Sequence, residues 1–200
     1  MDSESSSRLL TPLTASERRE LLWLARESIR SALHDEALPV PHMLTPSLLE
    51  RGAAFVSLHI EHDLRGCVGT LLAEHALHIT VAQRARSAAF DDPRFAPLAE
   101  AELAAVEIEI SRLSRLVPAC ADDVQPGVHG VCVSAGERRA VFLPQVAQRY
   151  GWDCATLLRE LCRKALLPPE AWQWPQTSLE IFEAEVFGET TDWETTDNRQ

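Results

Sequence analysis

Several stretches of this chain alternate between apolar and polar residues, and this two-residue period constrains the possible folds more than any other feature. In residues 53–61 one face carries Val56, Leu58 and Ile60, and the other carries Phe55, Ser57, His59 and Glu61. Such a period is typical of a β-strand with one buried face. His62–Asp63 then supplies a turn, and residues 64–72 would be the returning strand. The same alternation recurs in residues 106–111, 129–143 and 178–187.

Three other stretches repeat their apolar residues every three to four positions, which is the period of a helix with one buried side. They cover about 15–33, 74–90 and 153–165. Thr14 and Glu17 match a capping box before the first helix, and Asp153 can cap the third. Helices and strands mix without a regular βαβ rhythm, and 129–143 resembles a second hairpin. We therefore predict an α+β fold with a mainly antiparallel sheet flanked by helices.

Composition narrows the class of protein. Of 200 residues, 46% are apolar and 24% are charged, as in ordinary globular proteins. The net charge of −11 disfavours nucleic-acid and anionic-membrane partners. No stretch approaches the ~18 apolar residues of a membrane span, and the first residues do not resemble a signal peptide. Five cysteines without a CxxC pair indicate a reducing compartment, so we expect a cytoplasmic protein. Residues 1–12 should be flexible, and 189–200 should form a disordered acidic tail.

One short motif is far more specific than the rest of the chain. Residues 64–70 read LRGCVGT, with an arginine and a cysteine between glycines. Residues 85–95 read ARSAAFDDPRF, residues 107–111 read EIEIS, and LPQV, GWD and LCRKA follow between residues 143 and 165. This ordered set resembles the AMMECR domain family, whose signature hexapeptide is LRGCIG. The resemblance extends over about residues 15–187.

The resemblance implies a larger lobe, in which helices flank a sheet, and a smaller inserted lobe, with the hexapeptide near the cleft between them. We expect the domain at 13–188 and the smaller lobe at roughly 38–92. The family includes the AmmeMemoRadiSam system protein A, which implies a Memo-like protein and a radical S-adenosylmethionine enzyme as partners. The resemblance implies no defined biochemical activity, and we expect no cofactor. The family usually has glycine after LCRKA; this chain has Leu166, so that helix end should be built differently.

The motif can be interpreted as a thiol site. Cys67 would act as a thiolate, which a cation such as Arg65 favours, and residues 65 and 67 share one face of an ideal strand. Gly66 and Gly69 would leave backbone N–H groups open to an anion or to a developing negative charge. A base is also required. The candidates are His59, His62 and His129, with Glu107 and Glu109 behind them.

A structural interpretation of the same residues is favoured over the thiol site by the residues alone. Small residues let two backbones pack closely, so Cys67 would be a buried apolar residue and Arg65 an ion-pair partner. Asp92 and Arg94 either bind a ligand at the site or form a local pair at the end of a helix. The chain is thus either an accessory component with a small-molecule or peptide cleft and Cys67 as its reactive group, or a non-catalytic binding or adaptor module. We predict no metal site.

Overall fold

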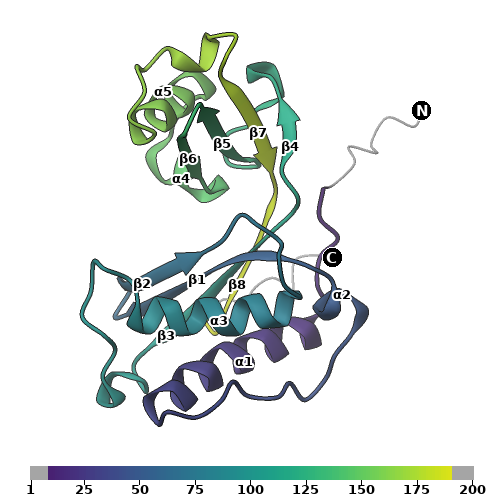
Figure 1. Ribbon diagram of the computed structural model, residues 1–200, viewed down its shortest axis with the longest axis vertical. Coiled ribbons are helices and arrows are strands. Elements are labelled where there is room, and N and C mark those ends of the chain that lie inside the picture. Colours follow the sequence, from purple (N-terminus) through teal and green to yellow (C-terminus); the bar gives the residue numbers. More distant parts are fainter. Residues whose placement is uncertain (1–8, 191–200) are drawn as a thin grey trace, which may run out of the picture. The chain divides into compact units, whose positions relative to one another are not determined.

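The alternating segments pair into two separate four-stranded antiparallel sheets in the computed structural model, which describes residues 9–190 (Figure 1). The strands of the first sheet are β1 (Ala53–Ile60), β2 (Asp63–Gly69), β3 (Glu107–Leu113) and β8 (Ala184–Gly188), in the order β2-β1-β3-β8. Those of the second are β4 (Val117–Ala119), β5 (Gly130–Ala135), β6 (Arg138–Phe142) and β7 (Ser178–Phe182), in the order β4-β7-β5-β6. The predicted α+β class is therefore confirmed.

Five α-helices accompany the described strands. They are α1 (Ala15–Leu33), α2 (Pro46–Leu49), α3 (Leu77–Phe90), α4 (Pro144–Tyr150) and α5 (Cys154–Lys164). The predicted capping box of α1 is present, because the Glu17 N–H donates to Thr14 Oγ1 over 3.3 Å and the Thr14 N–H donates to Glu17 Oε2 over 2.8 Å. The predicted cap of α5 is also present, since Asp153 accepts from the Thr156 N–H over 2.8 Å.

These elements form two compact units. The first unit comprises Thr11–Leu113 and the described residues from Glu185 onward, and the second comprises Ser114–Ala184 with the described residues before Thr11. The second unit thus interrupts the chain of the first. These boundaries differ from the expected smaller lobe at 38–92, because β1 pairs along its length with β3 and so residues on both sides of position 92 share one sheet.

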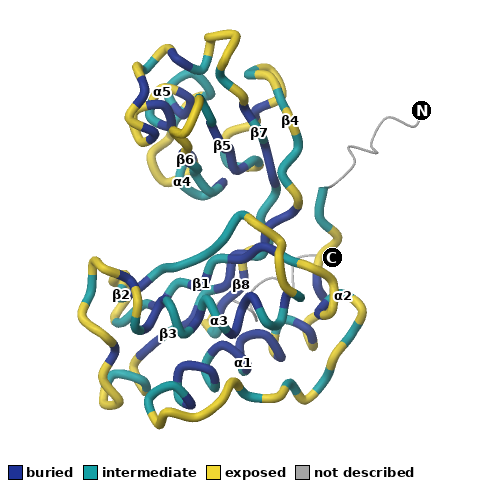
Figure 2. The backbone as a smooth tube through the Cα atoms, in the orientation of Figure 1, coloured by how far each residue is buried: buried dark blue, intermediate teal, exposed yellow. Residues whose placement is uncertain are grey.

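Helices α1 and α3 cover one face of the first sheet, and the core of the first unit lies in this layer (Figure 2). The strands contribute the buried residues Val56, Leu58, Ile108 and Ile110. Each such side chain contributes roughly 1.5–3 kcal/mol by leaving water. The opposite face of the sheet, which we call the open face, carries Ser57, His59, Cys67, Glu107 and Glu109.

Strands β1 and β2 form the predicted hairpin, but its turn is Glu61–His62, one residue earlier than expected. Both turn residues have positive φ, 52° and 71°, as a type I′ turn requires. A bulge follows in β2: His59 pairs with Leu64 and the regular pairing resumes at Gly66, so Arg65 is an extra residue without a partner on β1. This bulge decides where the arginine of the motif can point.

In the second unit, α4 and α5 pack against one face of the second sheet. Their contacts bury Val131 and Val133 of β5 together with Leu158 and Leu161 of α5. Strands β5 and β6 form the second predicted hairpin and turn at Gly136, whose φ is 60°. The two units therefore share one plan, a four-stranded sheet with its helices on a single face.

Helix α5 is followed by a non-glycine residue in an unfavourable backbone conformation. Leu166 has a φ of 58°, in the left-handed region, and its side chain is 79% exposed. Its N–H donates to the Arg163 carbonyl, and the Leu167 N–H donates to the Cys162 carbonyl, which together make the Schellman ending that glycine usually completes. The expected change in this helix end does not occur; leucine adopts the conformation typical of glycine.

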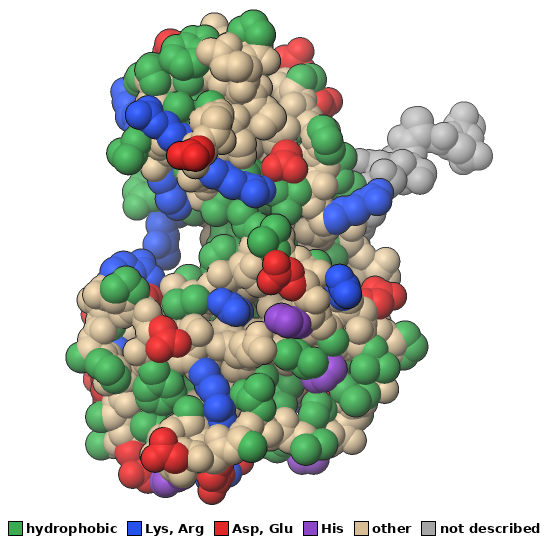
Figure 3. Space-filling view, in the orientation of Figure 1, with side chains coloured by type: hydrophobic (Ala, Val, Ile, Leu, Met, Phe, Trp, Pro, Cys, Tyr) green, Lys and Arg blue, Asp and Glu red, His purple; other side chains and the backbone are tan. Residues whose placement is uncertain are grey.

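The predicted flexible ends lie mostly outside residues 9–190. Within that range, Arg112 donates to the Thr11 carbonyl and Arg26 donates to the Glu189 carboxylate, so fixed contacts extend slightly beyond the expected domain boundaries. In the described part of the chain, no helix combines the length and apolar character needed to cross a membrane. Acidic side chains lie among basic ones on the face shown in Figure 3.

Candidate functional site

Cys67 lies in the middle of β2, with its side chain half-buried on the open face of the first sheet. It pairs with Ser57 on β1, which in turn pairs with Glu109 on β3, so the three side chains form one row across the sheet. The Ser57 hydroxyl donates to the Cys67 sulfur over 3.2 Å. A hydroxyl in this position could also donate to a thiolate, and Cys67 as a whole is only partly buried.

The backbone of Cys67 is held by two side chains from the segment after α3. Because β2 is an edge strand, the Cys67 N–H and C=O point out of the sheet. The N–H donates to Asp92 Oδ2 over 2.8 Å, and the carbonyl accepts from Arg94 Nη2 over 3.3 Å. Arg94 also donates to both Asp92 oxygens, over 2.9 and 2.6 Å. Asp92 and Arg94 thus replace a neighbouring strand at this position.

This arrangement has an electrostatic consequence for both side chains. The hydrogen bonds from Arg94 hold the pKa of the buried Asp92 carboxyl well below its usual range, and the Cys67 N–H adds to that effect. The same pairing raises the pKa of Arg94. The ion pair at the helix end, one of the two interpretations from the sequence, is present; a ligand-binding role for these residues stays a prediction.

The two glycines of the motif point to opposite faces of the sheet. A Cβ on Gly66 would lie 2.1 Å from the Ala88 carbonyl oxygen, so α3 can approach the sheet only because this residue has no side chain. A Cβ on Gly69 would lie 2.2 Å from the ring of Phe55. Gly66 is buried under α3, and a ligand-binding role for its backbone stays a prediction.

Arg65 does not follow the alternation that would have placed it beside Cys67. The bulge turns its guanidinium to Glu102, to which it donates two hydrogen bonds of 2.8 and 3.0 Å. This pairing raises the pKa of Arg65 and lowers that of Glu102. A catalytic role for Arg65 stays a prediction, and its charge is already balanced by a carboxylate within the first unit.

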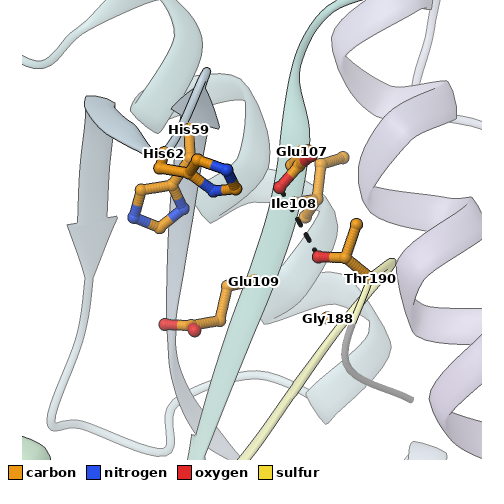
Figure 4. Close-up of a pocket in the computed structure, with 7 residues that line it drawn as sticks. All are labelled: His59, His62, Glu107, Ile108, Glu109, Gly188 and Thr190. Atoms are coloured by element: carbon orange, nitrogen blue, oxygen red, sulfur yellow. Dashed lines mark hydrogen bonds between the residues drawn. The ribbon is translucent and has the colours of Figure 1, made fainter. Parts of the chain in front are cut away.

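A shallow pocket of about 180 Å³ opens beside this row on the same face (Figure 4). Its lining comprises His59, His62, Glu107, Ile108, Glu109, Gly188 and Thr190. The Thr190 hydroxyl lies 3.5 Å from Glu107 Oε2. The structure therefore brings two of the three candidate histidines and both candidate glutamates together. His129 belongs to the second unit, where its Nδ1 lies 3.1 Å from the Asp123 carbonyl.

The possible metal ligands among the described residues are not grouped into a binding site. Between residues 9 and 190, no group of three or more histidine, cysteine or acidic side chains is arranged to hold a metal ion. All five cysteines are free thiols, and they differ in access: Cys132 and Cys162 are buried, while Cys120 is exposed. Burial raises the pKa of the Cys154 and Cys162 thiols.

Residues 22–187 match the family model described as AMMECR1. This chain belongs to the AMMECR1 family. The family resemblance inferred from the motif residues is confirmed by this match.

This AMMECR1-family chain is similar to proteins of several organisms. A protein of Aquifex aeolicus is 34% identical over 179 residues, spanning 86% of this chain and 92% of its own. A protein of Methanothermobacter thermautotrophicus is 34% identical over 186 residues, spanning 89% and 97%. The crystal structure of the uncharacterized protein PH0010 from Pyrococcus horikoshii matches with a TM-score of 0.80 and 31% identity, over 86% and 91% of the two chains.

Two residues of this AMMECR1-family site were not singled out from the sequence. Ser57 was placed correctly on the face of His59 by alternation, but no pattern pointed to its contact with Cys67. Thr190 lies within the segment expected to be a disordered tail, so no sequence pattern indicated that it would line the pocket. The Ser57 contact depends on the exact register of the β1–β2 hairpin, and the position of Thr190 depends on a strand far away in the sequence; a single sequence reveals neither.

Proposed function

We propose that this AMMECR1-family protein is a cytoplasmic accessory component that acts with a Memo-like protein and a radical S-adenosylmethionine enzyme. Its contribution is to bind a small molecule or a peptide on the open face of the first sheet, where Cys67 is the reactive thiol. The partners follow from the family resemblance, and the binding site follows from the geometry of the first unit.

The observation that carries the proposal is the setting of Cys67. Cys67 is half-buried on the open face, and its sulfur accepts a hydrogen bond from the Ser57 hydroxyl. Hydrogen bonds with Asp92 and Arg94 fix its backbone. The pocket on the same face, which Cys67 does not line, is lined by imidazoles and carboxylates, which are the groups that acid–base chemistry needs. A nucleophile requires both access and a fixed position; the partial burial of Cys67 and the hydrogen bonds to its backbone support this role.

The charge of the chain restricts the ligand. The net charge of −11 and the carboxylates of Glu107 and Glu109 oppose a phosphate backbone, so nucleic acid is not the ligand proposed. A pocket of about 180 Å³ accommodates a small molecule or one side chain of a peptide, not a folded domain.

The first experiment compares two thiols in one sample. Folded protein is treated with a limiting amount of iodoacetamide at about pH 7, and the labelling rates of Cys67 and Cys120 are obtained by peptide mapping. Cys120 is the matched control because it is the exposed cysteine of the set. We expect Cys67 to react faster although it is less exposed; a Cys67 slower than Cys120 contradicts the proposed thiol role.

A non-catalytic adaptor is the second candidate, and a specific observation favours it. Gly66, Gly69, Arg65, Asp92 and Arg94 all make contacts that hold the first unit together. An adaptor predicts a slow Cys67 and a stable complex with a Memo-like protein or a radical S-adenosylmethionine enzyme from the same organism. Co-purification that survives replacement of Cys67 by serine, together with slow labelling, would establish this alternative.

A further inference from the structure

The open face brings three side chains of complementary chemistry into neighbouring positions. Cys67 stands on β2, His59 on β1 and Glu107 on β3, and all three strands are adjacent. We infer that His59 is the base that takes the thiol proton of Cys67, and that Glu107 positions the imidazole. This inference rests on the proposed function, since it names the base of the same site.

The register places His59 on the same face of the sheet as Cys67, at a diagonal position. Cys67 pairs directly with Ser57, and His59 is two residues further along β1 on the same face. Such a diagonal pair lies about 7–8 Å apart at the backbone, a distance that an aromatic side chain can span. The Cys67–Ser57 pair is also the closer type, because the Cys67 backbone groups bond outside the sheet.

The bulge in β2 removes a competing charge from this position. In a regular hairpin the residue opposite His59 would be Arg65, whose guanidinium would lie beside the imidazole. Instead, His59 pairs with Leu64, and Arg65 reaches Glu102. An imidazole next to a guanidinium would resist protonation, so the displacement of Arg65 suits a base.

Glu107 lies directly opposite His59 on the neighbouring strand. Figure 4 shows the His59 ring on the side of β1 that faces this carboxylate, and both side chains line the same pocket. A carboxylate in this position orients an imidazole and stabilises its protonated form. No ion pair joins the two described side chains as they stand, so the proposed contact requires a side-chain rotation.

The other titratable groups near His59 are less well placed to act as the base. Glu109 stands opposite Ser57, one strand further from Cys67 than His59 is. His62 belongs to the turn between β1 and β2, and it is not paired with Cys67. The charged groups facing the imidazole are therefore Glu107 and Glu109 from β3, with His62 from the turn, and Cys67 completes the set from β2.

The proposed reaction begins with a proton transfer. The Cys67 S–H proton passes to the free ring nitrogen of His59, leaving a thiolate and an imidazolium. With iodoacetamide as the probe, the thiolate electron pair forms the S–C bond, the C–I bond breaks, and iodide leaves. The imidazolium then returns its proton to solvent.

The test is the pH dependence of Cys67 alkylation by iodoacetamide in the full chain. We expect His59→Gln to lower the rate at about pH 6.5 by tenfold or more, as the loss of a general base does. Near pH 9.5, where free thiols are mostly ionised, the two rates should agree within about twofold. Glu107→Gln should cause a smaller loss in the same direction, and His129→Gln, in the second unit, should cause none.

Rescue of the labelling rate by added imidazole tests the role of His59 even if a variant is less stable. Added imidazole should restore the rate of a folded His59→Ala protein near pH 6.5 and should not change that of the unsubstituted protein. A fast Cys67 whose pH profile is the same with and without His59 contradicts the inference alone, as does a loss produced by His62→Gln instead. A Cys67 no faster than Cys120 in the unsubstituted chain contradicts the proposed function as well.

Discussion

Each of the two sheets carries a cysteine on the face opposite its helices, yet the two sulfurs have different surroundings. Cys67 in β2 is half-buried, accepts a hydrogen bond from the Ser57 hydroxyl, and shares its face with an open pocket that it does not itself line. Cys132 in β5 is 0% exposed, and Arg139 Nε donates to its sulfur over 3.0 Å. The same guanidinium reaches Glu180 over 3.2 Å and so spans the face across three strands.

The difference lies in what the alternation places beside each cysteine. In the second sheet, the positions next to Cys132 are filled by an arginine and a glutamate that pair with each other. In the first, the bulge diverts Arg65 to Glu102, and Asp92 and Arg94 bind the backbone of Cys67 and not its sulfur. A cysteine beside a cation is therefore not automatically a reactive one, because the cation can bury it.

The largest expected effect tests how tightly the first sheet packs on its helix. Gly66→Ala would place a Cβ 2.1 Å from the backbone oxygen of Ala88, and a helix backbone cannot move aside locally. We expect a loss of about 3 kcal/mol or more in the free energy of unfolding, measured in urea. Gly130→Ala in the second sheet meets the side chain of Phe182 and should cost less. Equal losses would contradict the contrast between the two sheets.

A second test concerns the clamp on Cys67. Asp92 accepts from the Cys67 N–H and from three N–H groups of Arg94, so Asp92→Ala should cost about 2 kcal/mol at neutral pH. Asp123→Ala is the control, because this exposed carboxylate makes a similar backbone contact to Cys120 in the second unit. The control should lose much less stability in the same urea titration.

The same variant has a predicted pH dependence. The pKa of Asp92 is lower in the folded chain than in the unfolded chain, so its stabilisation is present above about pH 4 and is lost as pH falls. The gap in unfolding free energy between the unsubstituted protein and Asp92→Ala should therefore shrink from about pH 5 to pH 2. A gap that is constant over this range would show that the charge of Asp92 contributes nothing.

The smallest effect is a gain in stability within the second unit. Leu166 occupies a left-handed conformation that costs a non-glycine residue roughly 1–2 kcal/mol, so Leu166→Gly should raise the unfolding free energy by about 1 kcal/mol. Gly151, which ends α4 with a φ of 62°, is the matched position, and Gly151→Ala should lower it by a similar amount. A loss of stability in Leu166→Gly would mean that the exposed leucine makes contacts that outweigh its backbone strain.

Periodicity was enough to predict most of the secondary structure and the α+β class. The alternation of residues 53–61 placed Ser57 and His59 on one face, and the capping pair of Thr14 and Glu17 marked the start of α1 correctly. These features are local, so the sequence carries their whole signal.

The parts that could not be predicted depend on the exact register of strand pairs and on packing between separate segments. A one-residue bulge moved Arg65 away from Cys67, and nothing in LRGCVGT distinguishes a bulged strand from a regular one. Likewise, the need for glycine at position 66 comes from the Ala88 carbonyl of another helix. The boundary of the second unit escaped prediction because β1 pairs with a strand that begins at Glu107.

The most direct test of the central claim is to measure how far folding protects each of the two cysteines from iodoacetamide. Labelling of Cys67 and Cys132 is followed by peptide mapping in native protein and in urea-unfolded protein, at one pH near neutrality. We predict that Cys67 reacts in the native protein at least as fast as in the unfolded chain, whereas folding slows Cys132 by about a hundredfold or more. Protection of Cys67 to the same degree as Cys132 would contradict the account of an accessible, activated thiol on the open face.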